Sequence, residues 1–65
     1  MITVNGAVRD IELPLSVADL VRLLGHSERG IAIAIDDVVV PRARWSETSI
    51  PDGCAIEILT AVQGG

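Results

Sequence analysis

The chain has 65 residues, with nine acidic side chains, five arginines, no lysine and a formal net charge of −4. This length fits one domain, and an acidic chain with one aromatic residue lacks the basic patch typical of nucleic-acid-binding proteins. Cys54 is the only cysteine, which excludes an internal disulfide and a multi-cysteine metal site. No segment has the pattern of a signal peptide or approaches the ~20 apolar residues of a membrane helix. We therefore expect a cytoplasmic protein without nucleic-acid or membrane partners.

Residues 2–13 predict a β-hairpin that turns at Asn5-Gly6, because both residues of a two-residue loop need positive φ. This loop pairs Val4 with Ala7 and Ile2 with Arg9. One face of the hairpin then carries Ile2, Val4, Ala7, Ile11 and Leu13, and the other carries Thr3, Asp10 and Glu12. Arg9 on the inner face and Val8 on the outer face are exceptions to this separation.

A short helix is predicted after Pro14, which ends the second strand. Ser16 is the expected N-cap, and Asp19 lies three residues further on as an imperfect capping box. The residues at helical spacing are Val17, Leu20, Val21 and Leu24, which form one apolar stripe. Gly25 suits the left-handed position that follows a helix.

The second half of the chain predicts three more strands. Residues 31–36 alternate Ile with Ala, so that the isoleucines face the helix, and Asp36-Asp37 forms a turn into a short strand, 38–40, that Pro41 ends. Residues 42–50 predict a loop with a turn of 3₁₀ helix, and residues 51–53 a turn. The last strand, 55–62, is apolar on both faces except at Glu57 and Thr60, which is typical of a strand in the middle of a sheet.

The resulting order is β-β-α-β-β-β, an α+β fold with a mixed sheet and one main helix packed on one face. A hairpin, one helix and a central last strand beside the first are the β-grasp arrangement of ubiquitin-like domains. We expect one domain over residues 1–62 and a flexible tail over residues 63–65.

The side chains that carry chemistry elsewhere do not form a catalytic set here. Cys54 has no nearby base in the sequence, and His26, the only histidine, has no second ligand to make a metal site with it. Asp36 and Asp37 are adjacent on a strand end and point opposite ways, so they do not converge on one substrate. We expect no catalytic residue, no bound metal and no free-standing enzyme.

Trp45 leaves two interpretations open. It packs over one edge of the core, or it contacts a partner together with the neighbouring Arg42 and Arg44. The two arginines are equally compatible with solvated loop charges.

The chain ends on Gln63-Gly64-Gly65, directly after the predicted central strand. Glycines have no side chain and accept almost any φ and ψ, so this tail can enter a narrow channel of another protein. The terminal carboxylate is unreactive at neutral pH and becomes an acyl donor only after ATP-dependent activation. Gly65 is therefore the candidate modified residue, and Gln63 and Gly64 are the tail that reaches a partner's active site.

The sequence resembles the thiamine-biosynthesis sulfur carrier proteins, which are ubiquitin-like β-grasp domains. The resemblance covers essentially the whole chain, and it rests on "ITVNG", on V-P-R-x-x-W at Val40, Pro41, Arg42 and Trp45, on "IPDGCAIEI" and on the terminal "AVQGG". Cys54 departs from the family pattern, which often has an acidic residue at that position.

The resemblance implies a carrier that partner enzymes act on. A ubiquitin-activating-type adenylyltransferase would use ATP and Mg to adenylate Gly65, and the chain itself would bind no cofactor. A persulfide from a cysteine desulfurase or another donor would convert Gly65 to a thiocarboxylate (1-thioglycine), and thiazole synthase would take that sulfur. Two alternatives remain: a molybdopterin-type sulfur carrier, and a ubiquitin-like interaction module without covalent chemistry.

Overall fold

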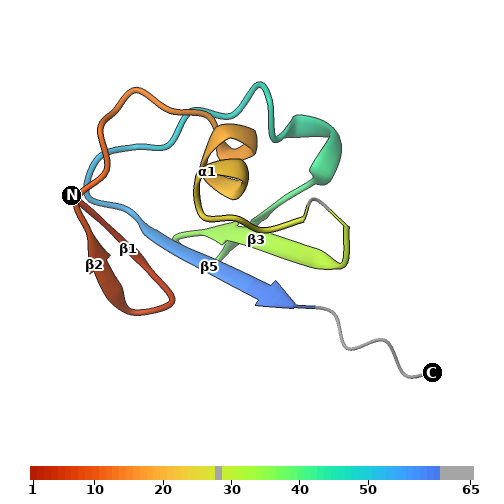
Figure 1. The fold of residues 1–65 in the computed structure, drawn as a ribbon, viewed down its shortest axis with the longest axis horizontal. Helices are drawn as coiled ribbons and strands as arrows, with labels where there is room; N and C mark the ends of the chain where they lie inside the picture. The colour runs from red at the N-terminus through yellow and green to blue at the C-terminus, as the bar shows by residue number, and fades with distance from the viewer. Residues whose placement is uncertain (28, 61–65) are drawn as a thin grey trace.

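The computed structural model describes residues 1–27 and 29–60, and Glu28 and residues 61–65 lie outside that description. Its elements are β1 (Ile2–Val4), β2 (Ala7–Arg9), α1 (Val17–Leu23), β3 (Ile31–Ile35), β4 (Val38–Val40), the 3₁₀ turn η1 (Arg42–Arg44) and β5 (Ala55–Thr60). The strands form one sheet in the order β2-β1-β5-β3-β4. β5 lies between β1, to which it is parallel, and β3, to which it is antiparallel (Figure 1). The predicted α+β fold, its element order and its central last strand are confirmed.

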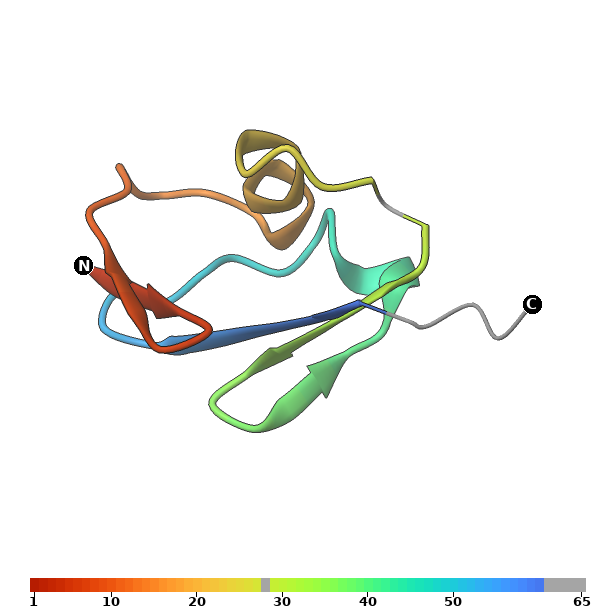
Figure 2. The ribbon, with the colours of Figure 1, turned by 60° about the horizontal axis from the view of Figure 1, so that its bottom comes forward.

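One helix covers one face of the sheet, and the core lies between them (Figure 2). The largest fully buried side chains come from both layers and are all aliphatic: Ile2, Leu20, Ile33, Ile56, Val17 and Val21. Ile31 and Ile35 pack against this core as partly buried residues. The predicted inward direction of the β3 isoleucines is therefore confirmed.

The first hairpin turns where the sequence predicts but is shorter than predicted. Asn5 and Gly6 have φ values of 51° and 84°, and the strands pair with Val4 opposite Ala7 and Ile2 opposite Arg9. The prediction that the second strand extends to Leu13 is wrong, because β2 ends at Arg9.

β2 ends at Arg9 because its partner, Ile2, is the first residue of β1. The Met1 main chain is bound on the other side of β1, toward the start of β5. The Met1 carbonyl accepts a hydrogen bond from the Gly53 N–H, and its ammonium group contacts the Asp52 carboxylate at 2.6 Å. Residues after Arg9 therefore have no strand to pair with. Ile11 and Leu13 still pack against the core, from a connecting segment and not from a strand.

Helix α1 begins and ends as the sequence predicts. The Ser16 hydroxyl accepts the Asp19 N–H at the N-terminus. At the C-terminus Gly25 has φ of 79°, and its main-chain N–H donates to the Arg22 carbonyl. The main-chain N–H of His26 donates to the Val21 carbonyl, and the two bonds together form a Schellman motif.

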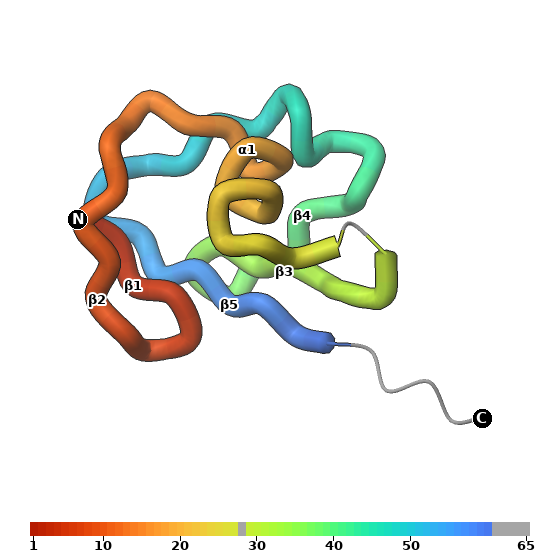
Figure 3. The backbone as a smooth tube through the Cα atoms, viewed as in Figure 1, coloured from red at the N-terminus to blue at the C-terminus, as the bar shows by residue number. Residues whose placement is uncertain are grey.

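The segment that follows β4 returns to the start of α1 (Figure 3). The Thr48 carbonyl accepts the Val17 N–H at 2.9 Å, and the Trp45 carbonyl accepts the Ala18 N–H at 3.2 Å. The first backbone donors of a helix have no partner within the helix, so these two contacts fix the 42–50 segment against the helix. The predicted 3₁₀ turn in this segment is confirmed.

Candidate functional site

The predicted tail, Gln63 to Gly65, lies outside the described residues, as does the predicted boundary after residue 62. The described part of the chain ends with β5, which extends to Thr60, opposite Ile31 on β3. The tail therefore follows, within a few residues, a strand that is held in the middle of the sheet. The assignment of Gly65 as the modified residue stays a prediction.

Trp45 belongs to the core. Its side chain is 2% exposed, and its indole Nε1–H donates to the Val40 carbonyl at 2.9 Å. The V-P-R-x-x-W stretch thus folds back through η1, so that the indole fills the core and satisfies the last carbonyl of β4. The packing interpretation of Trp45 is confirmed, and the indole is not available to a partner in this conformation.

Arg42 and Arg44 are both exposed and remain candidates for partner contact. The Arg44 guanidinium contacts the Glu47 carboxylate at 3.2 Å, a pair in which both side chains are well exposed. Exposed pairs of this kind contribute little to stability.

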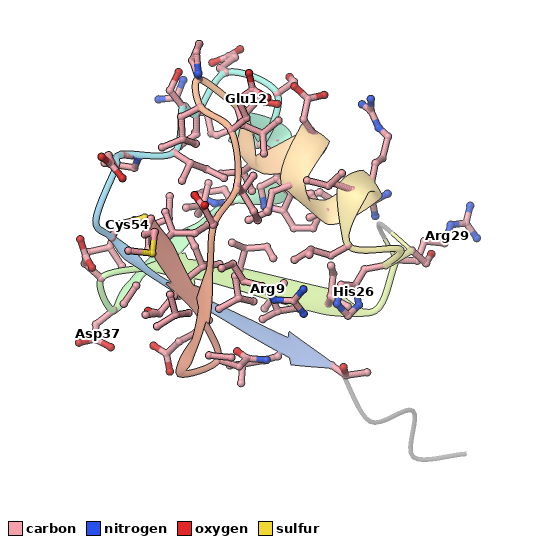
Figure 4. All side chains as sticks on the ribbon, turned by 60° about the vertical axis from the view of Figure 1, so that its left-hand side comes forward. Arg9, Glu12, His26, Arg29, Asp37 and Cys54 are labelled. Carbon is pink, nitrogen blue, oxygen red and sulfur yellow. The ribbon has the colours of Figure 1, made fainter. Side chains whose placement is uncertain are left out.

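Cys54 and His26 do not form a nucleophile and base pair. Figure 4 places Cys54 at the beginning of β5 and His26 toward its other end. The Cys54 side chain is 4% exposed, and burial raises the pKa of its thiol, with the Asp36 carboxylate as a second, smaller cause. The thiolate needed for nucleophilic attack is therefore disfavoured at neutral pH.

Asp36 has a structural role at the start of β5. Asp36 and Asp37 form the predicted turn with φ values of 47° and 70°. The Asp36 carboxylate accepts the Ala55 N–H at 2.9 Å, and the Asp36 N–H donates to the Ala55 carbonyl at 2.8 Å. Within residues 1–27 and 29–60, no three His, Cys, Asp or Glu side chains are grouped to hold a metal ion, and no helix has the length and apolar character to cross a membrane.

The side of the sheet that faces away from α1 carries exposed apolar residues that the sequence pattern did not indicate. Ala32 lies opposite Leu59, Ala34 opposite Val39, and Thr3 opposite Val8, and all three pairs share this side. Leu59, Val39 and Val8 are 62–66% exposed. We call these three residues the outer apolar face. Glu57, opposite Ala34, is exposed on the same side, so one charge interrupts this face. Exposed apolar residues that share one side of a sheet can mark an interaction site.

Comparison with known proteins decides the family. The family model described as "ThiS family" matches residues 2–65, which is nearly the whole chain. The chain belongs to the ThiS family. The crystal structure of a thiamine biosynthesis protein (ThiS) from Geobacter metallireducens is 28% identical, with a TM-score of 0.81 over 98% of this chain and 97% of that one.

Two further relatives of this chain are a sulfur carrier protein and a thiazole synthase. The sulfur carrier protein ThiS of Escherichia coli (strain K12) is 32% identical over 77% of this chain and 76% of its own. A thiazole synthase of Paramagnetospirillum magneticum (strain ATCC 700264 / AMB-1) is 27% identical over 98% of this chain, which spans only 20% of that protein. The resemblance found in the sequence is thereby confirmed: the protein is a sulfur carrier of thiamine biosynthesis and not an enzyme.

Proposed function

We propose that Gly65 carries the sulfur as a C-terminal thiocarboxylate. The observation that supports this most directly is the family match, which extends to residue 65 and so includes the terminal Gly-Gly. The described part of the chain has no assembled catalytic set, so partner enzymes supply the catalysis. The chain contributes the acyl group of Gly65, at the end of a short tail that follows the folded domain.

The chemistry proceeds in two activating steps. An adenylyltransferase of the ubiquitin-activating type binds ATP and Mg, and an oxygen of the Gly65 carboxylate attacks the α-phosphate and expels pyrophosphate. The terminal sulfur of a persulfide, supplied by a cysteine desulfurase or another donor, then attacks the acyl carbon and expels AMP. A second thiol then attacks the donor sulfur of this acyl disulfide, so that the two thiols end as a disulfide and the thiocarboxylate is released. These reactions belong to the cytoplasm, where we place the protein.

Thiazole synthase is the proposed acceptor of the sulfur. In the Paramagnetospirillum magneticum thiazole synthase, a segment similar to this whole chain is part of the synthase polypeptide. Such a fusion keeps the two parts at high effective concentration, as expected for a carrier and the enzyme that unloads it. We propose that the outer apolar face is the surface that docks on this enzyme.

The thiocarboxylate is tested by fragmentation mass spectrometry of the C-terminal peptide, after incubation with the adenylyltransferase, ATP, Mg and a persulfide donor. We expect the added sulfur on Gly65. Intact mass alone is insufficient, because exchanging oxygen for sulfur nearly equals one oxidation of Met1, Cys54 or Trp45. A modification that never localises to Gly65 would refute the proposal. Deletion of Gly64-Gly65 separates it from a non-covalent module, which would keep its function.

Docking is tested with two matched charge substitutions. Leu59 on β5 and Leu23 on α1 are equally exposed, at 62% and 61%, but lie on opposite layers of the domain. We expect Leu59→Glu to weaken binding to thiazole synthase at least tenfold in isothermal titration, because docking would bury a carboxylate without a partner, and Leu23→Glu to leave it nearly unchanged. Equal losses in both variants would exclude the outer apolar face as the docking surface.

A further inference from the structure

The side chain of Asn5 replaces a piece of missing strand. After Val4 the main chain of β1 turns away into β2, and the last main-chain donor of this strand toward β5 is the Asn5 N–H, which donates to the Ile56 carbonyl at 2.8 Å. Two residues further along β5, the Ile58 N–H donates to the Asn5 Oδ1 at 2.8 Å. The Asn5 Nδ2 in turn donates to the Ile58 carbonyl at 3.2 Å.

A carboxamide offers one acceptor and donors in nearly the geometry of a peptide group. Asn5 therefore extends the parallel β1–β5 ladder by one rung beyond the point where the β1 main chain has left. Among the described residues, Ile58 is the last β5 position that is bound on the β1 side, seven positions before Gly65. On the other side of β5, Thr60 still pairs with Ile31. The two contacts together hold both edges of the strand close to its end.

We propose that Asn5 is a positioning residue for sulfur transfer: its carboxamide fixes the direction in which β5 presents the residues after Thr60 to the partner's active site. This inference rests on the proposed function of Gly65. These hydrogen bonds set the point at which β5 leaves the sheet, and misplacement by about 1 Å can reduce a rate about a hundredfold.

A simple turn role for Asn5 makes a different prediction. Asn is favoured in two-residue loops because it tolerates positive φ, and glycine satisfies the same requirement. The Asn5→Gly variant thus keeps the turn and removes both hydrogen bonds to Ile58. The Asn5→Asp variant keeps the turn and one acceptor but loses the donor, and its carboxylate faces the Ile58 carbonyl. Asp37→Gly is the matched control, because Asp37 occupies the other two-residue hairpin turn with φ of 70°.

The first measurement is amide hydrogen exchange by NMR, which needs no partner. In Asn5→Gly we expect the Ile58 amide to exchange about tenfold faster, the size expected when a part-buried hydrogen bond is lost, while Asp37→Gly leaves it unchanged. Asn5→Asp keeps the acceptor for this amide, so there we expect the Ile58 amide to stay protected, and only the bond to the Ile58 carbonyl is lost. Unchanged exchange at Ile58 in Asn5→Gly would overturn the proposal.

The second measurement is steady-state adenylation of the folded variants by the activating enzyme. We expect Asn5→Gly and Asn5→Asp to lower kcat about tenfold with KM for the carrier unchanged, since the docking surface is intact. A kcat equal to that of Asp37→Gly, or a change in KM alone, contradicts positioning. If the unmodified chain is not adenylated at all, the proposed function of Gly65 fails, and the positioning role in sulfur transfer fails with it.

Discussion

Replacing Trp45 by phenylalanine tests whether this residue serves the core or a partner. The substitution keeps an aromatic ring in the core but removes the indole N–H that binds the Val40 carbonyl. A buried acceptor that loses its donor costs about 1–3 kcal/mol, and this site is only part-buried, which favours the lower part of that range. With the small cavity left by the lost ring atoms, we expect about 2 kcal/mol of destabilisation.

This loss is large for so small a domain. At roughly 0.05–0.15 kcal/mol per residue, the whole free energy of unfolding is about 3–10 kcal/mol. A loss of 2 kcal/mol corresponds to a decrease in Tm of about 8–16 °C. Because the variant has no tryptophan to report by fluorescence, unfolding in urea is followed by circular dichroism. Arg42→Ala, on an exposed side chain two positions after Val40, is the control, and we expect it to stay within about 0.5 kcal/mol of the original.

The packing interpretation of Trp45 is refuted if Trp45→Phe unfolds like the Arg42→Ala control. A folded Trp45→Phe variant of unchanged stability that binds the synthase more weakly would restore the partner-contact interpretation. If the packing interpretation holds, affinity is unchanged at temperatures where the variant stays folded.

Three further predictions concern stability and reactivity. Gly25→Ala should destabilise by about 1–2 kcal/mol in urea unfolding, because space for a Cβ is open but φ of 79° strains any L-residue; no change would mean that the Schellman turn relaxes freely. The Cys54 thiol should react with a disulfide reagent far more slowly in the native protein than in urea, since burial raises its pKa, and equal rates would show that it is accessible. The contact between the N-terminal ammonium and the Asp52 carboxylate lowers the pKa of Asp52 below 3.8 and raises the pKa of the ammonium above 8.0. The stabilisation by this ion pair is therefore fully present between pH 3.8 and pH 8.0. It is lost as pH falls through the lowered Asp52 pKa, and also as pH rises through the raised ammonium pKa. Asp52→Asn should remove that difference, and identical pH profiles for both proteins would contradict it.

Local sequence signals predicted the turns and caps because each depends on a few adjacent residues. Asn5-Gly6 and Gly25 need positive φ, and Ser16 offers a hydroxyl to the first turn of the helix. The length of the second strand could not be predicted in this way. It depends on where the partner strand begins, and β1 begins only at Ile2. Met1 instead binds the 52–53 turn, a contact across about 50 positions that leaves no trace in the local pattern.

The last strand shows a second limit of prediction from hydrophobic residues. Apolar residues on both sides of β5 indicated a strand in the middle of the sheet, and β5 is indeed central. Centrality concerns hydrogen bonds between strands, however, while burial depends on what covers each face. Ile56 and Ile58 face α1 and are buried, whereas Leu59 faces outward and stays exposed. Hydrophobicity alone does not distinguish a core residue from one that a partner covers.

Near each end of β5 the main chain is hydrogen-bonded to a polar side chain from a hairpin turn, and the sequence predicted only a turn role for these side chains. Asp36 binds the main chain of Ala55 at the start, and Asn5 binds that of Ile58 near the end, in both cases because a hairpin turn brings a short polar side chain to the strand. A three-residue strand such as β1 cannot pair with the whole of a six-residue neighbour. A side chain that acts as an extra rung therefore allows a very small domain to hold a long central strand, and that strand is the one that leads to Gly65.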